Sequence, residues 1–216
     1  QVVAPAGIAN VGFLIDQEQR IGWDHSLRDD EAAELADQWH SYFRERGYGQ
    51  QREFSAFEQA AGGERLDDGW RFRPDPRLQG IEGNWHSPEL DDTDWAAIGV
   101  DSHWKDQPWG AQWRQEHGED FQGVGWYRLE FAPAAEMLTD NRRVILFFGA
   151  VDTAAQVWVN NLLVAERPSN TDAWQEPFQV DITDALVREG ANTLAVRVDH
   201  VAGAGGIWKP VWLLAI

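Results

Sequence analysis

RRVILFFGAVDTAAQVWVNNLLVAE, residues 142–166, is the stretch that decides the fold of this chain. It holds three short runs rich in Val, Leu, Phe and Trp, at 142–149, 153–160 and 162–166. Short runs of this composition, bounded by turn residues, are typical of β-strands. Asn160 and Asn161 join the last two runs, and a two-residue asparagine turn tolerates the positive φ angles of a tight hairpin. The stretch therefore predicts consecutive antiparallel strands.

The same pattern extends on both sides of this stretch. Six further runs are predicted as strands: GWRFR (69–73), WAAIGV (95–100), GWYRLEF (125–131), EPFQVDI (176–182), NTLAVRV (192–198) and VWLLAI (211–216). A helical turn is expected over 184–189, before Gly190. Nine short strands without long helices between them predict a mainly β fold, an antiparallel two-sheet jelly-roll β-sandwich, over residues 67–216.

Residues 1–66 have a different pattern. IANVGFLI (8–15) is long enough for a buried strand, and residues 29–46 follow the period of an amphipathic helix, the only helix that the pattern makes convincing. Leu35, Trp39 and Phe43 fall on one face of this helix, and Gly47 follows its end. We expect an N-terminal strand, a helix and a linker, which either pack on the sandwich or are the remnant of a preceding domain.

The amino-acid composition limits the kinds of molecule that this chain is expected to bind. The 216 residues include 36 acidic and 18 basic side chains, for a net charge of −18. Such a field repels nucleic acids and anionic membranes, so neither is expected as a partner, whereas neutral hydroxyl-rich molecules are compatible with it. There are no cysteines, which excludes disulfides, thiolate metal sites and cysteine nucleophiles. No run is long enough for a membrane span.

Four blocks of the chain resemble a known family. They are GWYRLEF (125–131), FFGAVDTAAQVWVNNLLV (147–164), EPFQVDITDALVREGANTLAVRV (176–198) and GGIWKPVWL (205–213), preceded by GWRFRPDP (69–76) and GNWHSPELDDTDWAAIGV (83–100). In this order and spacing they resemble the sugar-binding domain of family-2 glycoside hydrolases, the β-galactosidases, β-glucuronidases and β-mannosidases. The resemblance covers roughly residues 67–216.

The resemblance implies a galactose-binding-like jelly roll beside a separate catalytic barrel, which carries the catalytic glutamates. No residue of this chain matches those motifs, so we expect no catalytic residue here and a non-catalytic carbohydrate-binding module of a larger polysaccharide-degrading enzyme. Oligo- or polysaccharide and the enzyme's own catalytic domain are the implied partners, and a secreted or periplasmic location is expected. The segments 101–124 and 167–175 depart from the family pattern.

The tryptophans fall into two groups, those expected to pack in the core and those expected to contact a sugar. A sugar site needs aromatic faces in loops, with polar side chains beside them to hold hydroxyls. Tryptophans in strand or family-typical positions are expected in the core: Trp70, Trp85, Trp95, Trp126, Trp158 and Trp212. Aromatic and polar residues of the divergent segments are predicted to bind carbohydrate: Trp104, Trp109, Trp113, Arg114, Asp172, Trp174 and Gln175. The resemblance adds Lys209, which follows the glycine-rich run AGAGG (202–206).

Alternatives remain open at several of these positions. Trp104, Trp109 and Trp113 also fit a satellite cluster that covers the open end of the sandwich, and the core also suits Trp208. The Asp152 carboxylate is expected to cap local backbone donors rather than to catalyse.

Two alternatives to a carbohydrate-binding module concern the role of the whole chain. The domain could be a structural accessory that packs on a catalytic barrel without binding sugar itself. A third possibility is a small hydrolase that uses Asp16 and Glu18, which follow the predicted N-terminal strand. No cofactor or metal site is predicted, although Asp91, Asp92 and Asp94 have the chemistry of a structural calcium site.

Overall fold

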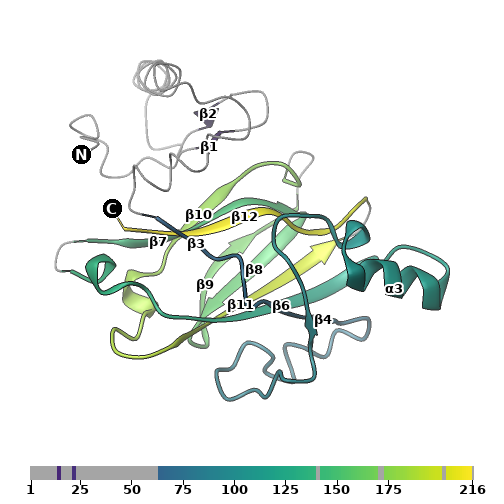
Figure 1. Ribbon diagram of the computed structural model, residues 1–216, viewed down its shortest axis with the longest axis horizontal. Helices are drawn as coiled ribbons and strands as arrows, with labels where there is room; N and C mark the ends of the chain where they lie inside the picture. The colour runs from purple at the N-terminus through teal and green to yellow at the C-terminus, as the bar shows by residue number, and fades with distance from the viewer. Residues whose placement is uncertain are drawn as a thin grey trace.

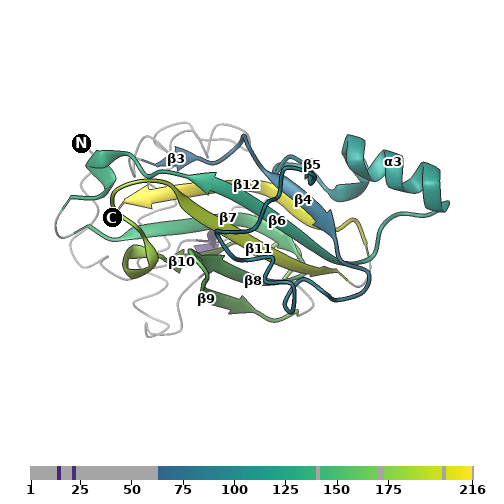
Figure 2. The same cartoon turned by 90° about the horizontal axis from the view of Figure 1, so that it is seen from below.

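A computed structural model describes residues 63–139, 142–169, 173–200 and 203–215 in full, and the backbone of 14–15 and 21–22. Within this part of the chain the fold is mainly β, as predicted, with two antiparallel sheets that face each other (Figures 1 and 2). The six-stranded sheet has the order β5-β4-β6-β11-β8-β9, and the four-stranded sheet has the order β10-β7-β12-β3.

All nine predicted strands are present. Their bounds are β4 (Arg71–Pro74), β5 (Ala96–Ala97), β6 (Gly123–Phe131), β7 (Val144–Asp152), β8 (Ala154–Val159), β9 (Leu162–Arg167), β10 (Phe178–Asp181), β11 (Asn192–His200) and β12 (Gly206–Ala215). Asn160 and Asn161 have φ angles of 49° and 73°, which confirms the tight turn between β8 and β9. Of the helical turn expected over 184–189, the structure has only a short 3-10 helix, η3 (Thr183–Ala185), and residues 186–189 are not helical.

The structure adds elements that the pattern did not predict. β3 (Glu64–Arg65) pairs with β12, so the four-stranded sheet begins three residues before the expected boundary at residue 67. A 3-10 helix, η1 (Trp104–Asp106), and a helix, α3 (Pro108–His117), replace the loop expected after β5, and η2 (Ala135–Met137) follows β6. Helix α3 projects from one end of the sandwich (Figure 2).

The N-terminal segment is described only at two short strands. β1 (Leu14–Ile15) pairs antiparallel with β2 (Ile21–Gly22). β1 lies within the run 8–15 that the sequence predicts as a strand. The helix predicted over 29–46 lies outside the described residues, as do Asp16 and Glu18.

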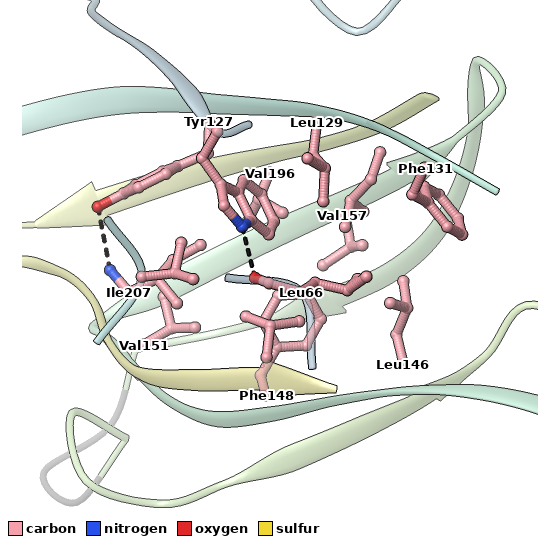
Figure 3. Close-up of a cluster of buried hydrophobic side chains, with 14 of the residues drawn as sticks. Leu66, Tyr127, Leu129, Phe131, Leu146, Phe148, Val151, Val157, Val196 and Ile207 are labelled. Atoms are coloured by element: carbon pink, nitrogen blue, oxygen red, sulfur yellow. Dashed lines mark hydrogen bonds between the residues drawn. The ribbon is translucent and has the colours of Figure 1, made fainter. Parts of the chain in front are cut away.

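The main core lies between the two sheets. Side chains from β6, β8 and β11 meet those of β7 and β12, and Figure 3 shows Tyr127, Leu146, Phe148 and Val196 pointing toward one another. The Tyr127 hydroxyl ties the two sheets together, because its oxygen accepts the Ile207 N–H at 3.2 Å (Figure 3). This core holds the two ends of the sandwich in fixed positions.

A second cluster lies on the outer face of the six-stranded sheet. Trp95, Trp126 and Trp158 are buried there, with Trp85 partly buried against them. The segment between β4 and β5 covers this face: Asp75 accepts the Trp126 Nε1–H at 3.1 Å, and Arg128 donates to the Trp85 carbonyl at 2.7 Å. The six tryptophans expected in the core are therefore buried, except that Trp85 is only half-buried.

Candidate functional site

Three aromatic rings from distant segments meet at one end of the sandwich. His103 precedes η1, Trp174 follows β9, and Trp208 lies in β12. The His103 and Trp208 rings stack with centroids 4.7 Å apart and planes 17° apart, and the Trp174 and Trp208 rings stack at 5.8 Å and 21°. The Trp208 Nε1–H donates to the Trp174 carbonyl at 2.6 Å. These three residues are called the Trp208 aromatic group below.

A β-bulge explains how Trp208 reaches this position. In the pairing of β12 with β7, Ile207 opposes Val151 and Lys209 opposes Ala150, which leaves Trp208 as the extra residue. A bulge releases one residue from the ladder and re-aims its side chain. Trp208 is consequently half-buried, while Ile207 enters the core.

The aromatic group has an exposed edge and a cation beside it. Trp174 is 40% exposed, so part of its indole faces solvent. The Lys209 ammonium lies 4.7 Å from the centroid of the Trp208 ring, within the range of a cation–π contact. Gln175 follows Trp174 in the chain and is half-buried. Lys209 is only 8% exposed, so the accessible part of the group is the Trp174 ring, an aromatic surface of the kind on which sugars stack.

Beneath the aromatic group lies a buried polar pair. Asp152, at the end of β7, accepts the Gly205 N–H at 3.0 Å, and its other oxygen is 3.5 Å from Nδ1 of His200. Gly205 has a φ of +67°, and a Cβ there would lie 2.3 Å from the Trp104 ring, so only glycine fits. Asp152 caps a backbone donor, as expected, but that donor is 53 residues away rather than local.

The pKa values of Asp152 and His103 are shifted from their usual values. Burial is the largest influence on Asp152 and raises its pKa, but His200, the Gly205 N–H and His103 together lower the pKa below its usual value. For His103, burial lowers the pKa. The Gly205 hydrogen bond and the carboxylates of Asp152 and Asp106 raise it by less, so the pKa of His103 lies below its usual value. At neutral pH the structure therefore holds an anionic Asp152 under a neutral His103 ring.

Buried polar atoms without a hydrogen bond gather at the same end, although Asp152 lies 3.5 Å from His200 and Arg167 lies 3.6 Å from Glu176. Of the seven buried side-chain polar atoms without a hydrogen-bond partner in the described part of the chain, five belong to four residues here: His103, Asp152, Arg167 and His200. Arg167 lies at this end of the sandwich, because its Nη1 donates a hydrogen bond to the carbonyl of Val151, the residue before Asp152, at 3.4 Å. Native proteins leave few such atoms unpaired, and those that remain tend to mark functional positions.

The first predicted cluster, Trp104 to Arg114, is largely structural. Trp104 is 1% exposed and donates its Nε1–H to the Tyr127 hydroxyl at 2.5 Å, so it belongs to the core and offers no ring face to a ligand. Its assignment to the carbohydrate-binding set is thereby corrected. Trp109 and Trp113 lie on α3, half-buried against the core, with Phe121 in edge contact with both. They form the satellite cluster that was the alternative interpretation.

Arg114 holds this helix in place. Its Nε pairs with the Asp120 carboxylate and its Nη2 donates to the Lys105 carbonyl at 3.0 Å. The side chain is thus engaged in joining α3 to the segments before and after it. The structure does not bring Arg114 to the Trp208 aromatic group.

The second predicted cluster is brought together. Trp174 and Lys209 both contact Trp208, while Asp172 lies outside the described residues. Sequence reasoning missed His103 and preferred the core for Trp208. The glycines of Gly203–Gly206 were the available signal for a close approach of the backbone, but the bulge that turns Trp208 outward leaves no mark in the residue pattern.

No metal or membrane site emerges in the described part of the chain. No group of three or more His, Cys, Asp or Glu residues there has the arrangement of a metal site. The carboxylates considered for calcium have other partners: Asp91 accepts from Thr93, Asp92 pairs with Arg128 at 2.7 Å, and Asp94 lies 3.5 Å from Arg73. No helix within the described residues has the length and apolar character that crossing a membrane requires.

Comparisons with known proteins give curated relatives of much greater length. A β-glucuronidase of Paenibacillus borealis is 30% identical over 132 residues, 61% of this chain and 20% of the relative. An exo-β-D-glucosaminidase of Streptomyces avermitilis is 39% identical over 79 residues, 37% of this chain and 8% of the relative. This chain thus matches a fifth or less of the length of these relatives.

Solved structures share the fold. A glycosyl hydrolase family 2 member of Bacteroides cellulosilyticus is 25% identical, with a TM-score of 0.55 over 71% of this chain and 20% of that protein. The β-glucuronidase of Ruminococcus gnavus is 20% identical, with a TM-score of 0.59 over 71% of this chain and 28% of that protein, and supports the fold alone.

A family model covers most of the described sandwich. The model for the sugar-binding domain of glycosyl hydrolases family 2 matches residues 64–208, from β3 to Trp208 of the aromatic group. Its first matched residue is the first residue of β3, which agrees with the start of the four-stranded sheet. The chain belongs to the family of glycosyl hydrolase family 2 sugar-binding domains.

Proposed function

We propose that this chain is a non-catalytic carbohydrate-binding module of a larger, secreted or periplasmic glycoside hydrolase, and that the Trp208 aromatic group is its sugar platform. The observation that carries this proposal is the stack of His103, Trp174 and Trp208 at one end of a family-2 sugar-binding domain. Three rings from three segments hold one another rigid, and rigid aromatic surfaces bind sugars with little loss of conformational freedom.

The polar surroundings narrow the ligand class. Gln175 directly follows Trp174 in the chain and is half-buried, so its amide is the proposed hydrogen-bonding group for the hydroxyls of the ligand. The net charge of −18 disfavours polyanionic glycans over neutral or cationic ones, because the surface field repels an acidic polymer. Oligo- or polysaccharides of neutral or amino sugars are therefore the preferred ligands.

Calorimetry with the full chain tests the proposal. The panel holds a neutral β-glycan, chitosan as a cationic glycan and a polyuronate, and binding to one of the first two is expected. Trp174→Ala is expected to weaken that binding about tenfold, since one stacked face is lost. Leu162→Ala is the matched control: Leu162 is an exposed apolar residue at the other end of β9, and its loss leaves affinity unchanged.

Two outcomes contradict the proposal. If no glycan of the panel gives binding heat, the module has no independent affinity for sugar. If Trp174→Ala binds as tightly as the unchanged chain, the Trp208 aromatic group is not the platform.

The second candidate function is a structural accessory domain. It is favoured by the small share of the relatives' length that this chain matches, which leaves room for a catalytic domain to cover the exposed edge of Trp174. It predicts no glycan binding by this chain alone, together with loss of activity in the longer enzyme when Trp174 is changed. Calorimetry on the chain and a glycosidase assay on the longer enzyme distinguish the two functions.

A further inference from the structure

The four-stranded sheet carries a second apolar face, away from the core. Along β7 and β12 the side chains alternate, so that Leu146, Phe148 and Leu213 enter the core between the sheets. The residues that alternate with these along each strand have side chains on the other face of the sheet, where they form a separate cluster: Ile145, Phe147, Trp212 and Leu214. The pairing places Phe147 opposite Trp212 and Ile145 opposite Leu214, which makes one continuous patch, called the outer patch below.

The outer patch is buried within a single chain. Its four side chains are between 0% and 5% exposed. No partly buried hydrophobic side chain of the described residues packs on it, in contrast to the outer face of the six-stranded sheet, where Trp85 and Leu90 do so. A sheet with two apolar faces needs a layer on each. Arg143, Phe147 and Trp212 each make at least one further interaction, so none of the three lacks a partner.

The border of the patch is polar. Gln179 and Asp181 of β10 pair with Phe147 and Ile145, and Arg65 of β3 pairs with Trp212. These three neighbours share the face and are exposed. The area that needs a cover is thus about two strands wide, which suits the apolar stripe of one helix.

Chain connectivity indicates which segment provides that cover. β3 is an edge strand of this same sheet and pairs with Trp212 and Leu213 of β12, so Glu64 and Arg65 lie next to the outer patch (Figure 1 shows β3 beside β12). Residues 29–46 have the pattern of an amphipathic helix, with Leu35, Trp39 and Phe43 on one face. The residues from 47 to 62 can span up to roughly 55 Å when extended, so the linker does not limit the reach of this helix.

We propose that the helix predicted over residues 29–46 packs its Leu35–Trp39–Phe43 face on the outer patch, as a third layer of the domain. The N-terminal segment is then part of this domain and not a remnant of another. A second copy of the chain is disfavoured as the cover, since the patch is already buried in one chain. The proposal does not depend on sugar binding.

Thiol labelling tests this packing directly, because the chain has no cysteine of its own. Leu214→Cys places a single thiol in the outer patch, and Ile145→Cys is a second reporter in case the first variant folds poorly. Both are expected to react slowly with a maleimide. Adding Leu35→Asp and Trp39→Asp should raise the labelling rate at least about tenfold, because charged side chains oppose burial on the patch.

Controls separate undocking from unfolding. Asp37→Lys with Arg44→Glu changes charges on the side of the helix opposite Leu35, Trp39 and Phe43 and should leave the thiol protected. Leu162→Cys, on an exposed position of β9, should react at one fast rate in every background, and near-ultraviolet circular dichroism should keep the signal of the packed core.

Three results overturn the proposal. Fast labelling of both reporters in the otherwise unchanged chain means that nothing covers the patch. Continued protection in the Leu35→Asp, Trp39→Asp background means that another segment covers it. Protection that falls on dilution, with dimers in sedimentation, means that a second copy does so.

Discussion

The aromatic cluster on α3 and the Trp208 aromatic group are built from the same residue types but present opposite surfaces. On α3, Trp109 and Trp113 turn inward, and His117 stacks on Trp113 with centroids 3.8 Å apart. In the Trp208 aromatic group the rings stack on one another, and Trp174 remains 40% exposed. The difference shows that backbone geometry, a helix in one case and a bulge in the other, decides whether a polar tryptophan-rich segment completes a core or forms a surface.

The largest effect is expected where the two regions touch. Trp104 packs against Gly205 on one side and lies 6.4 Å from Trp109 on the other, ring centroid to ring centroid. Trp104→Ala leaves a large cavity and should lower the free energy of unfolding by about 3–5 kcal/mol. Urea denaturation followed by circular dichroism measures this. A loss below about 1 kcal/mol would mean that Trp104 is not a core residue.

A smaller loss is expected for Gly205→Ala. The new Cβ would meet the Trp104 ring at 2.3 Å, and a φ of +67° disfavours any side chain. Strain of this kind is expected to lower the free energy of unfolding by about 1–3 kcal/mol, again measured by urea denaturation. Gly190→Ala is the comparison, because it has a positive φ but open space around its Cβ. Equal losses in the two variants would mean that the contact with Trp104 does not matter.

The variants Trp113→Ala and Trp174→Ala should distinguish residues that contribute to folding stability from residues that contribute to glycan binding. Trp113 is half-buried on the core, so its loss should lower the free energy of unfolding by about 1–2 kcal/mol and leave glycan affinity unchanged. Trp174 is expected to behave in the opposite way, with a change in unfolding below about 1 kcal/mol. Thermal denaturation and calorimetry on both variants check this. Loss of glycan affinity in Trp113→Ala alone would move the platform to α3.

The smallest effect concerns pH. Burial lowers the pKa of His103 and of His86 below the value of 6.5 that the unfolded chain keeps. The unfolded state therefore binds more protons in this range. The stability contributed by the neutral imidazoles is complete above pH 6.5 and is lost as the pH falls through the folded pKa values.

His103→Gln should accordingly make the melting temperature less sensitive to pH between about 7.5 and 5.5. Differential scanning calorimetry at several pH values measures the slope. An unchanged slope would show that His103 is protonated as easily in the folded chain as in the unfolded one.

The strands could be predicted because their signal is local. Alternation and turn residues mark all nine of them, and the asparagine pair fixes the β8–β9 hairpin before any tertiary contact is known. Helix α3 was missed although Pro108 begins it and Gly118, in a left-handed conformation, ends it. Its glutamines, glycine and tryptophans resemble a loop, and its apolar side is defined by contacts of Trp109 with Phe72 and Phe121, which come from other segments.

The candidate site was only half predictable. Trp174 could be predicted as a tryptophan in a divergent segment, and Lys209 as a cation that follows a glycine-rich run, but their partner Trp208 has the sequence context of a core strand residue. His103 lies next to a buried tryptophan and more than 100 residues before Trp208 in the chain. Contacts between such distant segments depend on the packing of the whole sandwich, which no local pattern contains.

The pairing of β3 with β12 has a consequence for how this domain is joined to others. Glu64 opposite Leu213 brings the beginning and the end of the sandwich to adjacent strands, a separation of about 5 Å. A domain with neighbouring ends can be gained, lost or transplanted between polypeptides as one cassette, since its insertion hardly changes the distance between flanking segments. Any domain that follows it in a longer enzyme would therefore be attached next to the strand by which the N-terminal segment enters the sandwich.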